Sequence, residues 1–356
     1  MRYKSFLIVT LVCVVLLVSI QAEASTGKRI GTAGASELLI PVGARATALG
    51  GANLAYVSGV EAIYWNPAGI VATEQKAEAM FSHTEWIADI NLDYFAATFS
   101  LGSVGAVGVS LNNVGFGEIN ETTIQNPEGT GSVFSPNYLT VGLSYSRKMT
   151  DRIHFGITGK MISEKIMSVS ASGFGLDVGL QYVNAAAGLK LGVALTNFGT
   201  EMKFDGSDLE TRVQLPGTES GTTISSVAIP AAKFDLPSQL KIGVAYDMLK
   251  TERNLLSLVG SFVNNSYAYD QYTLGAEFAF DKMFFLRWAF TTAYREGLDD
   301  VNDAFTFASQ DHIFGPSFGA GFKFEVGANM SLSLDYAYRT TQFLNDSQWF
   351  SIIVGF

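Results

Sequence analysis

The feature that most constrains this chain is a two-residue alternation of side-chain character that recurs along most of its length. In residues 329–339 one face carries only apolar or aromatic side chains, and the other carries polar or charged ones: Met330, Leu332, Leu334, Tyr336 and Tyr338 against Asn329, Ser331, Ser333, Asp335 and Arg339. Residues 174–182, 239–248 and 272–281 repeat the pattern. Because successive side chains of a strand point to opposite faces, the chain is predicted to consist largely of β-strands with two unlike faces.

Residues 1–24 have the organisation of a secretory signal peptide. Arg2 and Lys4 precede an apolar run from Phe6 to Ile20, and residues 22–24 (Ala-Glu-Ala) form a small-x-small cleavage site. A retained N-terminal anchor is the alternative, but the run is short for a spanning helix, which needs roughly 20 apolar residues. The single cysteine, Cys13, lies in this run, so the exported part is expected to have neither disulfides nor thiolate chemistry.

The composition leaves two classes for an exported chain of this kind. Charged residues make up only 16% and the mean hydropathy is +0.23, yet no apolar run after residue 24 is long enough for a transmembrane helix. The chain is therefore either a large soluble β-protein or a transmembrane β-barrel. Glycine and serine dominate the polar face, which favours a crowded barrel lumen over bulk water. The net charge of −10 argues against nucleic-acid binding.

The alternating segments predict an antiparallel, all-β, transmembrane barrel of about fourteen strands over residues 75–356. The segments are 75–82, 91–101, 103–113, 138–148, 152–164, 170–182, 188–197, 238–248, 253–264, 270–281, 283–296, 312–325, 328–340 and 346–356. Connections after odd-numbered segments are predicted to run from about five to about forty residues, whereas those after even-numbered segments have about five or fewer. The even number predicts an outer-membrane barrel with both termini periplasmic, and the asymmetry of the connections independently predicts an outer-membrane location, in contact with its lipids.

Residues 25–74 do not share the alternation and are predicted to form a partly helical plug, or hatch, in the lumen. Gly50-Gly51 interrupts an alanine-rich stretch, and Asn66-Pro67 predicts a chain reversal, because asparagine caps a turn and proline fixes φ. Gly69 is expected to allow tight backbone packing and Trp65 to be buried. Inward-facing charges of both signs also suit a filled lumen: Lys160, Lys190, Lys241, Asp247, Glu277, Asp281, Arg287, Lys323, Glu325, Asp335 and Arg339.

Catalytic, metal-binding and cofactor-binding signatures find little support. His83, His154 and His312 show no ligand spacing, and no nucleophile–histidine constellation stands out, so we expect neither an enzyme nor a bound cofactor. An acidic stretch at residues 299–303, with Asp299, Asp300 and Asp303, is interpreted as a solvated loop rather than a calcium site. The chain ends on an alternating strand with Phe350 and the terminal Phe356 on one face, which resembles the signal read by barrel-assembly machinery.

The front of the mature chain resembles the PorV/PorQ family, within the larger FadL-like group of outer-membrane barrels. The likeness rests on a small-Arg-x-x-x-Leu-Gly-Gly-Ala stretch followed by an aromatic-Asn-Pro-Ala-Gly turn: Gly43, Arg45, Leu49, Gly50, Gly51, Ala52, Tyr64, Trp65, Asn66, Pro67, Ala68 and Gly69. The resemblance implies a fourteen-strand barrel with an N-terminal hatch. It also implies an accessory role in type IX-like protein secretion, in which the barrel binds a large translocon and secreted cargo.

The same resemblance leaves a second function open. FadL-like relatives carry hydrophobic small molecules such as long-chain fatty acids, and a channel of that kind would place a greasy pocket between hatch and wall. Leu38, Leu39, Ile40 and Trp65 are the residues expected to contact such a ligand. The sequence favours the secretion role, because the two motifs are closer to the PorV/PorQ branch than to the fatty-acid transporters.

Overall fold

The computed structural model describes residues 31–214, 224–294, 305–306, 313–327 and 330–356. The predicted signal peptide, the acidic residues Asp299, Asp300 and Asp303, and His312 lie outside the described residues.

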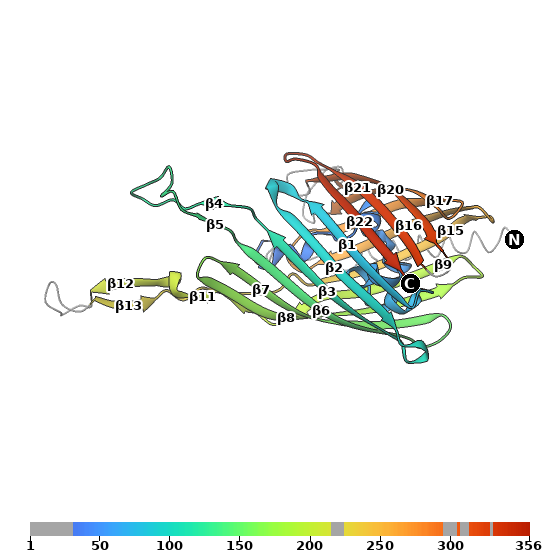
Figure 1. The fold of residues 1–356 in the computed structure, drawn as a ribbon, viewed down its shortest axis with the longest axis horizontal. Coiled ribbons are helices and arrows are strands. Elements are labelled where there is room, and N and C mark those ends of the chain that lie inside the picture. The colour runs from blue at the N-terminus through green and yellow to red at the C-terminus, as the bar shows by residue number, and fades with distance from the viewer. Residues whose placement is uncertain (1–30, 215–223, 295–304, 307–312, 328–329) are drawn as a thin grey trace.

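Within the described residues, fourteen long strands form one closed antiparallel β-barrel (Figure 1). They are β1 (Ala77–Glu85), β2 (Asn91–Ser100), β3 (Ala106–Gly115), β6 (Asn137–Lys148), β7 (Ile153–Ile166), β8 (Val169–Asn184), β9 (Leu189–Gly199), β15 (Gln239–Lys250), β16 (Asn254–Asn265), β17 (Asp270–Phe280), β18 (Phe284–Tyr294), β20 (Phe314–Val326), β21 (Met330–Thr341) and β22 (Ser347–Gly355). Each pairs with its neighbours in sequence, and β1 pairs with β22 to close the wall. Every long strand corresponds to one predicted segment.

The two faces of the wall differ as the alternation predicts. On β17 and β18 the outward Leu274 and Leu286 are 62% and 63% exposed, whereas the inward Thr273 and Arg287 are 3% and 5% exposed. Apolar side chains exposed over the whole outer surface of a barrel are typical of a wall that contacts lipid. Among the inward charges that the sequence predicts, Asp281 and Glu325 are exposed, Asp281 in the turn after β17 and Glu325 near the end of β20.

No helix among the described residues is long and apolar enough to cross a membrane.

The connections differ in length between the two ends of the barrel. One end, called here the long-loop end, carries residues 86–90, 116–136, 167–168, 200–238, 266–269, 295–313 and 342–346. The other, the short-turn end, carries 101–105, 149–152, 185–188, 251–253, 281–283 and 327–329. The prediction is wrong for one loop: 167–168 is a two-residue turn, because β7 and β8 pair as far as Ile166 and Val169, beyond their predicted ends.

Two of the long connections contain structure of their own. Residues 116–136 form the hairpin β4 (Ile119–Asn120) and β5 (Val133–Phe134). Residues 200–238 contain β10 (Met202–Lys203), β11 (Asp205–Gly206), η7 (Ser207–Leu209), β12 (Glu210–Gln214), β13 (Ile224–Ala228) and β14 (Lys233–Phe234). The hairpins β4–β5 and β12–β13 project beyond the barrel at the end opposite the C-terminus (Figure 1). Shorter elements elsewhere are η5 (Ile87–Asp89), η6 (Gly102–Val104) and β19 (Phe305–Thr306), which pairs with β18.

The N-terminal segment (residues 31–73) consists of short helical turns. They are η1 (Ser36–Leu39), α2 (Ala44–Ala48), η2 (Ala52–Ala55), η3 (Gly59–Glu61), α3 (Ala62–Trp65) and η4 (Pro67–Ala72). The predicted break at Gly50-Gly51 separates α2 from η2, and both glycines have positive φ, at 59° and 76°. Asn66 adopts extended angles and caps η4, with Pro67 as its first residue, as the Asn-Pro pair predicts.

This segment packs against the inward faces of strands from all around the wall. Where it approaches the wall most closely, the wall carries glycine. A Cβ on Gly156 would lie 2.2 Å from the Pro67 carbonyl, and a Cβ on Gly192 would lie 2.6 Å from the Leu54 oxygen. Side chains this small let one backbone lie directly against another, which is the physical use of glycine in a strand.

Apolar contacts complete the packing between the segment and the wall. The largest buried cluster joins Val60, Ile63 and Trp65 of the segment to Met80 and Leu92 of β1 and β2, among other residues. A smaller cluster packs Leu49 and Ala52 against Ala245 and Val259 on the far side. The inward face of the barrel is therefore covered by protein where these strands meet the segment.

The N-terminal segment runs from one end of the barrel to the other. The amide of Gly31 donates to the Tyr267 carbonyl and that of Gly34 to the Asp235 carbonyl, both at the long-loop end. After η4, the Lys76 amide donates to the carbonyl of Phe356 at the short-turn end. The first described residues and the C-terminus thus lie at opposite ends of the barrel.

Two glycines of β7 provide a matched test of this packing. Gly156→Ala should lower the free energy of unfolding by about 1–3 kcal/mol, because its Cβ would overlap the backbone at Pro67. Gly159→Ala should cause no loss, because no atom lies within 4 Å of that Cβ position. Urea unfolding in lipid vesicles and proteolysis of the N-terminal segment measure both effects. Equal behaviour of the two variants would show that the segment does not lie against β7.

Candidate functional site

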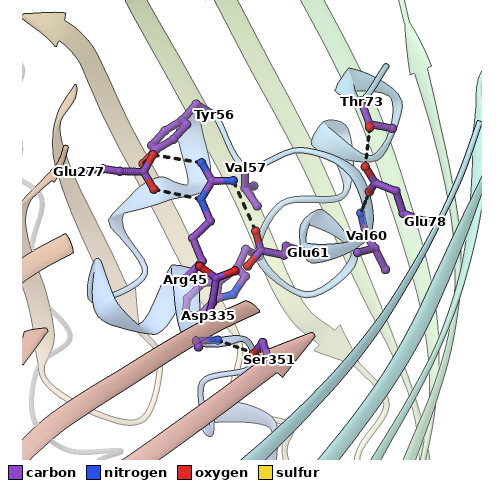
Figure 2. Close-up of polar contacts among 12 residues, drawn as sticks. Arg45, Tyr56, Val57, Val60, Glu61, Thr73, Glu78, Glu277, Asp335 and Ser351 are labelled. Carbon is purple, nitrogen blue, oxygen red and sulfur yellow. Dashed lines mark hydrogen bonds and ion pairs between the residues drawn. The ribbon is translucent and has the colours of Figure 1, made fainter. Parts of the chain in front are cut away.

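Arg45 is the arginine of the small-Arg-x-x-x-Leu-Gly-Gly-Ala stretch, and it forms an ion pair across the lumen with the barrel wall. It lies on α2, and its Nε and Nη2 donate to Oε2 and Oε1 of Glu277 on β17, each at 3.1 Å (Figure 2). The Tyr56 hydroxyl donates to the same carboxylate at 3.3 Å. This is a two-bond guanidinium–carboxylate pair, the geometry that makes arginine the preferred cation for such contacts.

The Glu277 carboxylate also belongs to a row of ion pairs along the wall. Arg287 Nε on β18 donates to Glu277 at 2.7 Å, and Arg287 Nη1 donates to Asp335 on β21 at 2.5 Å. All three wall side chains are at most 5% exposed. Buried charges are costly unless each has a counter-charge, and here positive and negative groups alternate along the chain of contacts.

Glu61 is the second acidic neighbour of Arg45. Its Oε2 lies 3.7 Å from Arg45 Nη1, whereas its buried Oε1 has no hydrogen-bond partner among the described residues (Figure 2). Burial raises the pKa of Glu61 to about 7, Arg45 opposes this shift, and Asp335 adds to it. Glu61 is therefore held less firmly than Glu277 within the same network.

Glu78 joins two turns of the segment to the start of β1. Its Oε2 accepts a hydrogen bond from the Val60 amide at 2.7 Å, and its Oε1 accepts one from the Thr73 hydroxyl at 2.5 Å (Figure 2). A Cβ on Gly59 would lie 1.8 Å from the carboxylate, so glycine is required there. The Ala44 amide, at the beginning of α2, donates to Ser351 Oγ at 2.8 Å.

Trp65 and Asn66 anchor the predicted reversal. Trp65 Nε1 donates to the Val42 carbonyl at 2.8 Å, and its ring lies against Gly51, where a Cβ would come within 2.4 Å. Asn66 Nδ2 donates to the carbonyls of Leu54 and, on β8, Leu180, while its Oδ1 accepts from the Ala68 amide.

The remaining glycines of the two motifs allow close packing. A Cβ on Gly69 would lie 2.1 Å from the Val57 oxygen, and one on Gly50 would lie 2.7 Å from Thr273 and 2.9 Å from Thr291 on the wall. The motif residues that the sequence singles out thus contact one another or the wall.

A cavity of about 570 Å³ lies between the N-terminal segment and the long-loop end of the wall. Leu39, Ile40 and Trp65, three of the expected ligand contacts, line it, whereas Leu38 packs in a separate cluster with Ile162 and Met202. Aromatic side chains dominate the rest of the lining: Tyr64, Trp86, Phe116, Tyr138 and Phe314. Its size and lining are those of a ligand pocket.

Two cations face this cavity. Lys241 Nζ lies 5.5 Å from the centre of the Trp65 ring, and Arg339 Cζ lies 4.3 Å from that of Phe314. Neither cation forms an ion pair within the part of the chain that the structure describes. Both side chains are less than a tenth exposed.

Glu37 on η1 lies beside Glu164 on β7, and both are buried. Neither Glu37 carboxylate oxygen has another hydrogen-bond partner among the described residues. Burial and the negative charge of Glu164 raise the pKa of Glu37 to about 8. Two buried carboxyl groups in contact are stable only while one of them holds a proton.

Phe350 and Phe356, the expected assembly signal, lie on the outer face of the last strand and are 47% and 53% exposed.

The sequence predicts the motif residues of the N-terminal segment but not the wall residues that they contact. Nothing in the chain marks Glu277 as the carboxylate that meets Arg45, because strand register and tilt decide which inward acid lies opposite α2. Glu37 and Glu164 carried no signal either, since each is an ordinary acidic residue in the sequence. The one indication in the sequence is that charged residues of both signs are predicted to face the lumen.

The sequence matches the family model described as "Type IX secretion system protein PorV" over residues 23–259. None of the curated protein sequences matches significantly.

Solved structures share the fold at low sequence identity. The Pseudomonas putida toluene transporter TodX has a TM-score of 0.54 at 11% identity, covering 86% of this chain and 96% of that one. A TodX deltaS2S3 mutant, titled a monoaromatic hydrocarbon channel, has a TM-score of 0.54 at 12% identity, covering 88% and 97%. A FadL homologue of Pseudomonas aeruginosa has a TM-score of 0.48 at 13% identity, covering 93% and 97%.

The Glu37–Glu164 contact predicts a pH dependence of the attachment of η1. The pKa of Glu37 is higher in the folded state (about 8) than its ordinary value of 4.5, so folding favours the protonated acid. The attachment should be strongest below about pH 4.5 and weaken as the pH rises towards 8. Proteolysis of residues 31–41 across this pH range measures it. Glu37→Gln should abolish the dependence, and an unchanged profile in that variant would contradict the assignment.

Proposed function

Because this chain belongs to the PorV family of type IX secretion system proteins, we propose that it is a non-enzymatic accessory component of protein secretion. It is an outer-membrane β-barrel, and in this proposal it binds a large translocon and the secreted cargo that the translocon releases. The family membership is the single observation that carries the proposal.

The long-loop end offers the surface that such partners need. The hairpins β4–β5 and β12–β13 extend away from the barrel, and the exposed apolar side chains of the long loops include Ile124, Val133 and Ile229 (Figure 1). Loops that project from a rigid scaffold are where binding residues concentrate, and exposed apolar groups on them favour contact with another protein. In the proposed orientation this end faces outward and Phe356 faces the periplasm.

The N-terminal segment would act as the plug of the barrel. It contacts strands on all sides, and the Arg45–Glu277 pair and the Glu78 hydrogen bonds hold it. A barrel filled in this way does not need to conduct solutes in order to serve as a docking partner. The outward Phe350 and Phe356 would be read by the barrel-assembly machinery during insertion into the lipid bilayer.

Removing the β4–β5 hairpin tests the secretion role. Replacing residues 118–135 by a short Gly-Ser turn should reduce recovery of the large translocon subunit with the affinity-purified barrel at least about tenfold, because interface energy concentrates in few residues. The barrel should still migrate as a folded, heat-modifiable species. The matched control exchanges the short turn 251–253 for the same Gly-Ser turn. A strain without the gene that secretes its full set of proteins with C-terminal sorting domains would contradict the proposal.

A second candidate function is a channel for hydrophobic small molecules, which the aromatic cavity beside Leu39, Ile40 and Trp65 favours. The solved barrels of the same fold carry titles that name toluene and monoaromatic hydrocarbons. If this chain binds such molecules, the cavity would be the site.

Quenching of tryptophan fluorescence by toluene or oleate would test this second function. Trp65→Phe keeps an aromatic ring but removes the indole N–H that donates to Val42, and it should weaken binding while leaving the barrel intact. Trp288→Phe, on the outer face, serves as the control. The channel function would be wrong if the purified barrel bound neither molecule and deletion caused no growth defect on long-chain lipids.

A further inference from the structure

Five acidic side chains of the lumen each lie beside a cation. They form ion pairs with arginine or lysine and are Glu61, Asp177, Asp247, Glu277 and Asp335. Glu37 on η1 and Glu164 on β7 differ from these residues. They are only 5% and 3% exposed, and within the described part of the chain neither forms an ion pair. The two carboxyl groups are in contact with each other instead.

Three of the four carboxylate oxygens of this pair lack a donor. Both oxygens of Glu37 and Oε1 of Glu164 are buried without a hydrogen-bond partner among the residues that the structure describes. The backbone amide of Ala35 donates to Glu164. A proton shared between two carboxyl groups forms one O–H···O bond, so it still leaves one buried oxygen of Glu37 without a partner. Because buried oxygens without partners are costly, the pair calls for a positive group that contacts several oxygens at once.

The pair adjoins both an apolar cluster and the cavity at the long-loop end. Leu38, Ile162 and Ala171 belong to one buried cluster, and Ala171 is the cross-strand neighbour of Glu164. Surroundings that exclude water strengthen the attraction between a carboxylate and a cation. Glu37 also lines the cavity of about 570 Å³. An ion and its water ligands therefore have a route to the pair from this cavity.

The available ligands indicate the class of the cation. Ca²⁺ binds six to eight oxygens, which are supplied by carboxylates, backbone carbonyls and water. No third His, Cys, Asp or Glu side chain joins the pair in the described ranges, so the arrangement does not suit Zn²⁺, which prefers four nitrogen or sulfur ligands. Water and backbone oxygens would complete the shell. With two charged ligands, the dissociation constant for Ca²⁺ should be about 10⁻⁴–10⁻³ M, as in extracellular calcium-binding modules.

We propose that Glu37 and Glu164 bind a calcium ion, which joins η1 to β7 at the long-loop end of the barrel. The ion neutralises both carboxylates and contacts the oxygens that have no donor. It also fastens the first part of the N-terminal segment, residues 31–41, to the wall, where no ion pair among the described residues does so. The inference does not depend on the proposed secretion function.

Terbium luminescence tests the site, because Tb³⁺ occupies calcium sites and nearby aromatic rings sensitise its emission. Tyr138 on β6 pairs with Glu164 in register and is an electrostatic neighbour of both carboxylates. The full-length barrel in phosphatidylcholine nanodiscs should give a saturable emission that Ca²⁺ displaces. Glu37→Gln and Glu164→Gln should each weaken Tb³⁺ binding at least about tenfold, because each removes one of two charged ligands. The control Glu201→Gln, an exposed acid paired with Lys233 at the same end, should leave it unchanged.

Proteolysis of residues 31–41 shows whether the ion fastens the segment. In the unaltered protein, Ca²⁺ at ten times its dissociation constant should slow cleavage about tenfold relative to EDTA, because a ligand that binds only the attached state stabilises it by that factor. Glu37→Gln should be cleaved at the same rate under both conditions.

Three results would overturn the inference. They are an unaltered protein that gives no sensitised emission, an emission that Ca²⁺ does not displace, and Tb³⁺ binding that survives in both glutamine variants, which would place the ion elsewhere in the chain. Equal cleavage with Ca²⁺ and with EDTA would also contradict it. The comparison of Ca²⁺ with EDTA uses the unaltered protein, so a variant that fails to fold does not block the test.

Discussion

The ion pair between Arg45 and Glu277 is the interaction on which the position of the N-terminal segment depends. It joins residues 232 positions apart in the sequence, and through Arg287 and Asp335 it ties α2 to three strands of the wall. Each buried charge in this row of ion pairs is compensated by its neighbours. Removing one charge would therefore leave its partner buried without a counter-charge, which is strongly destabilising. The segment therefore has one arrangement in the lumen that satisfies all of these groups.

That arrangement also requires irregular backbone to be buried without losing its hydrogen bonds. Leu54 lies in the short turn η2 and Val57 follows that turn, and amide side chains of the segment and the wall donate to their carbonyls: Asn66 Nδ2 to Leu54, and Gln181 Nε2 to both. Glycines on the inward face bring the wall close enough for these contacts. Non-helical backbone is tolerated at membrane depth only where protein surrounds it in this way.

The sequence predicts the barrel well because the alternation of apolar and polar side chains within each strand reflects its outer and inner surroundings. A strand can therefore be recognised without knowing which strand it pairs with. The break at Gly50-Gly51 and the cap at Asn66 are also local, so they too are visible. The pairing of Arg45 with Glu277 and the contact of Glu37 with Glu164 are not local. They depend on how far each strand is shifted and tilted around the barrel.

The N-terminal segment is held unevenly along its length. Residues 43–70 carry the Arg45 ion pairs, the Asn66 hydrogen bonds and the largest apolar cluster. Residues 31–41 meet the wall at the long-loop end through the hydrogen bond from the Gly34 amide to the Asp235 carbonyl, the one from Trp349 Nε1 to the Pro41 carbonyl, and the smaller apolar cluster around Leu38. Leu39, Ile40 and Pro41 are also cavity-lining residues. Among the described residues, the ion pairs of the segment therefore lie in residues 43–70, and its first residues are held by backbone hydrogen bonds and apolar packing.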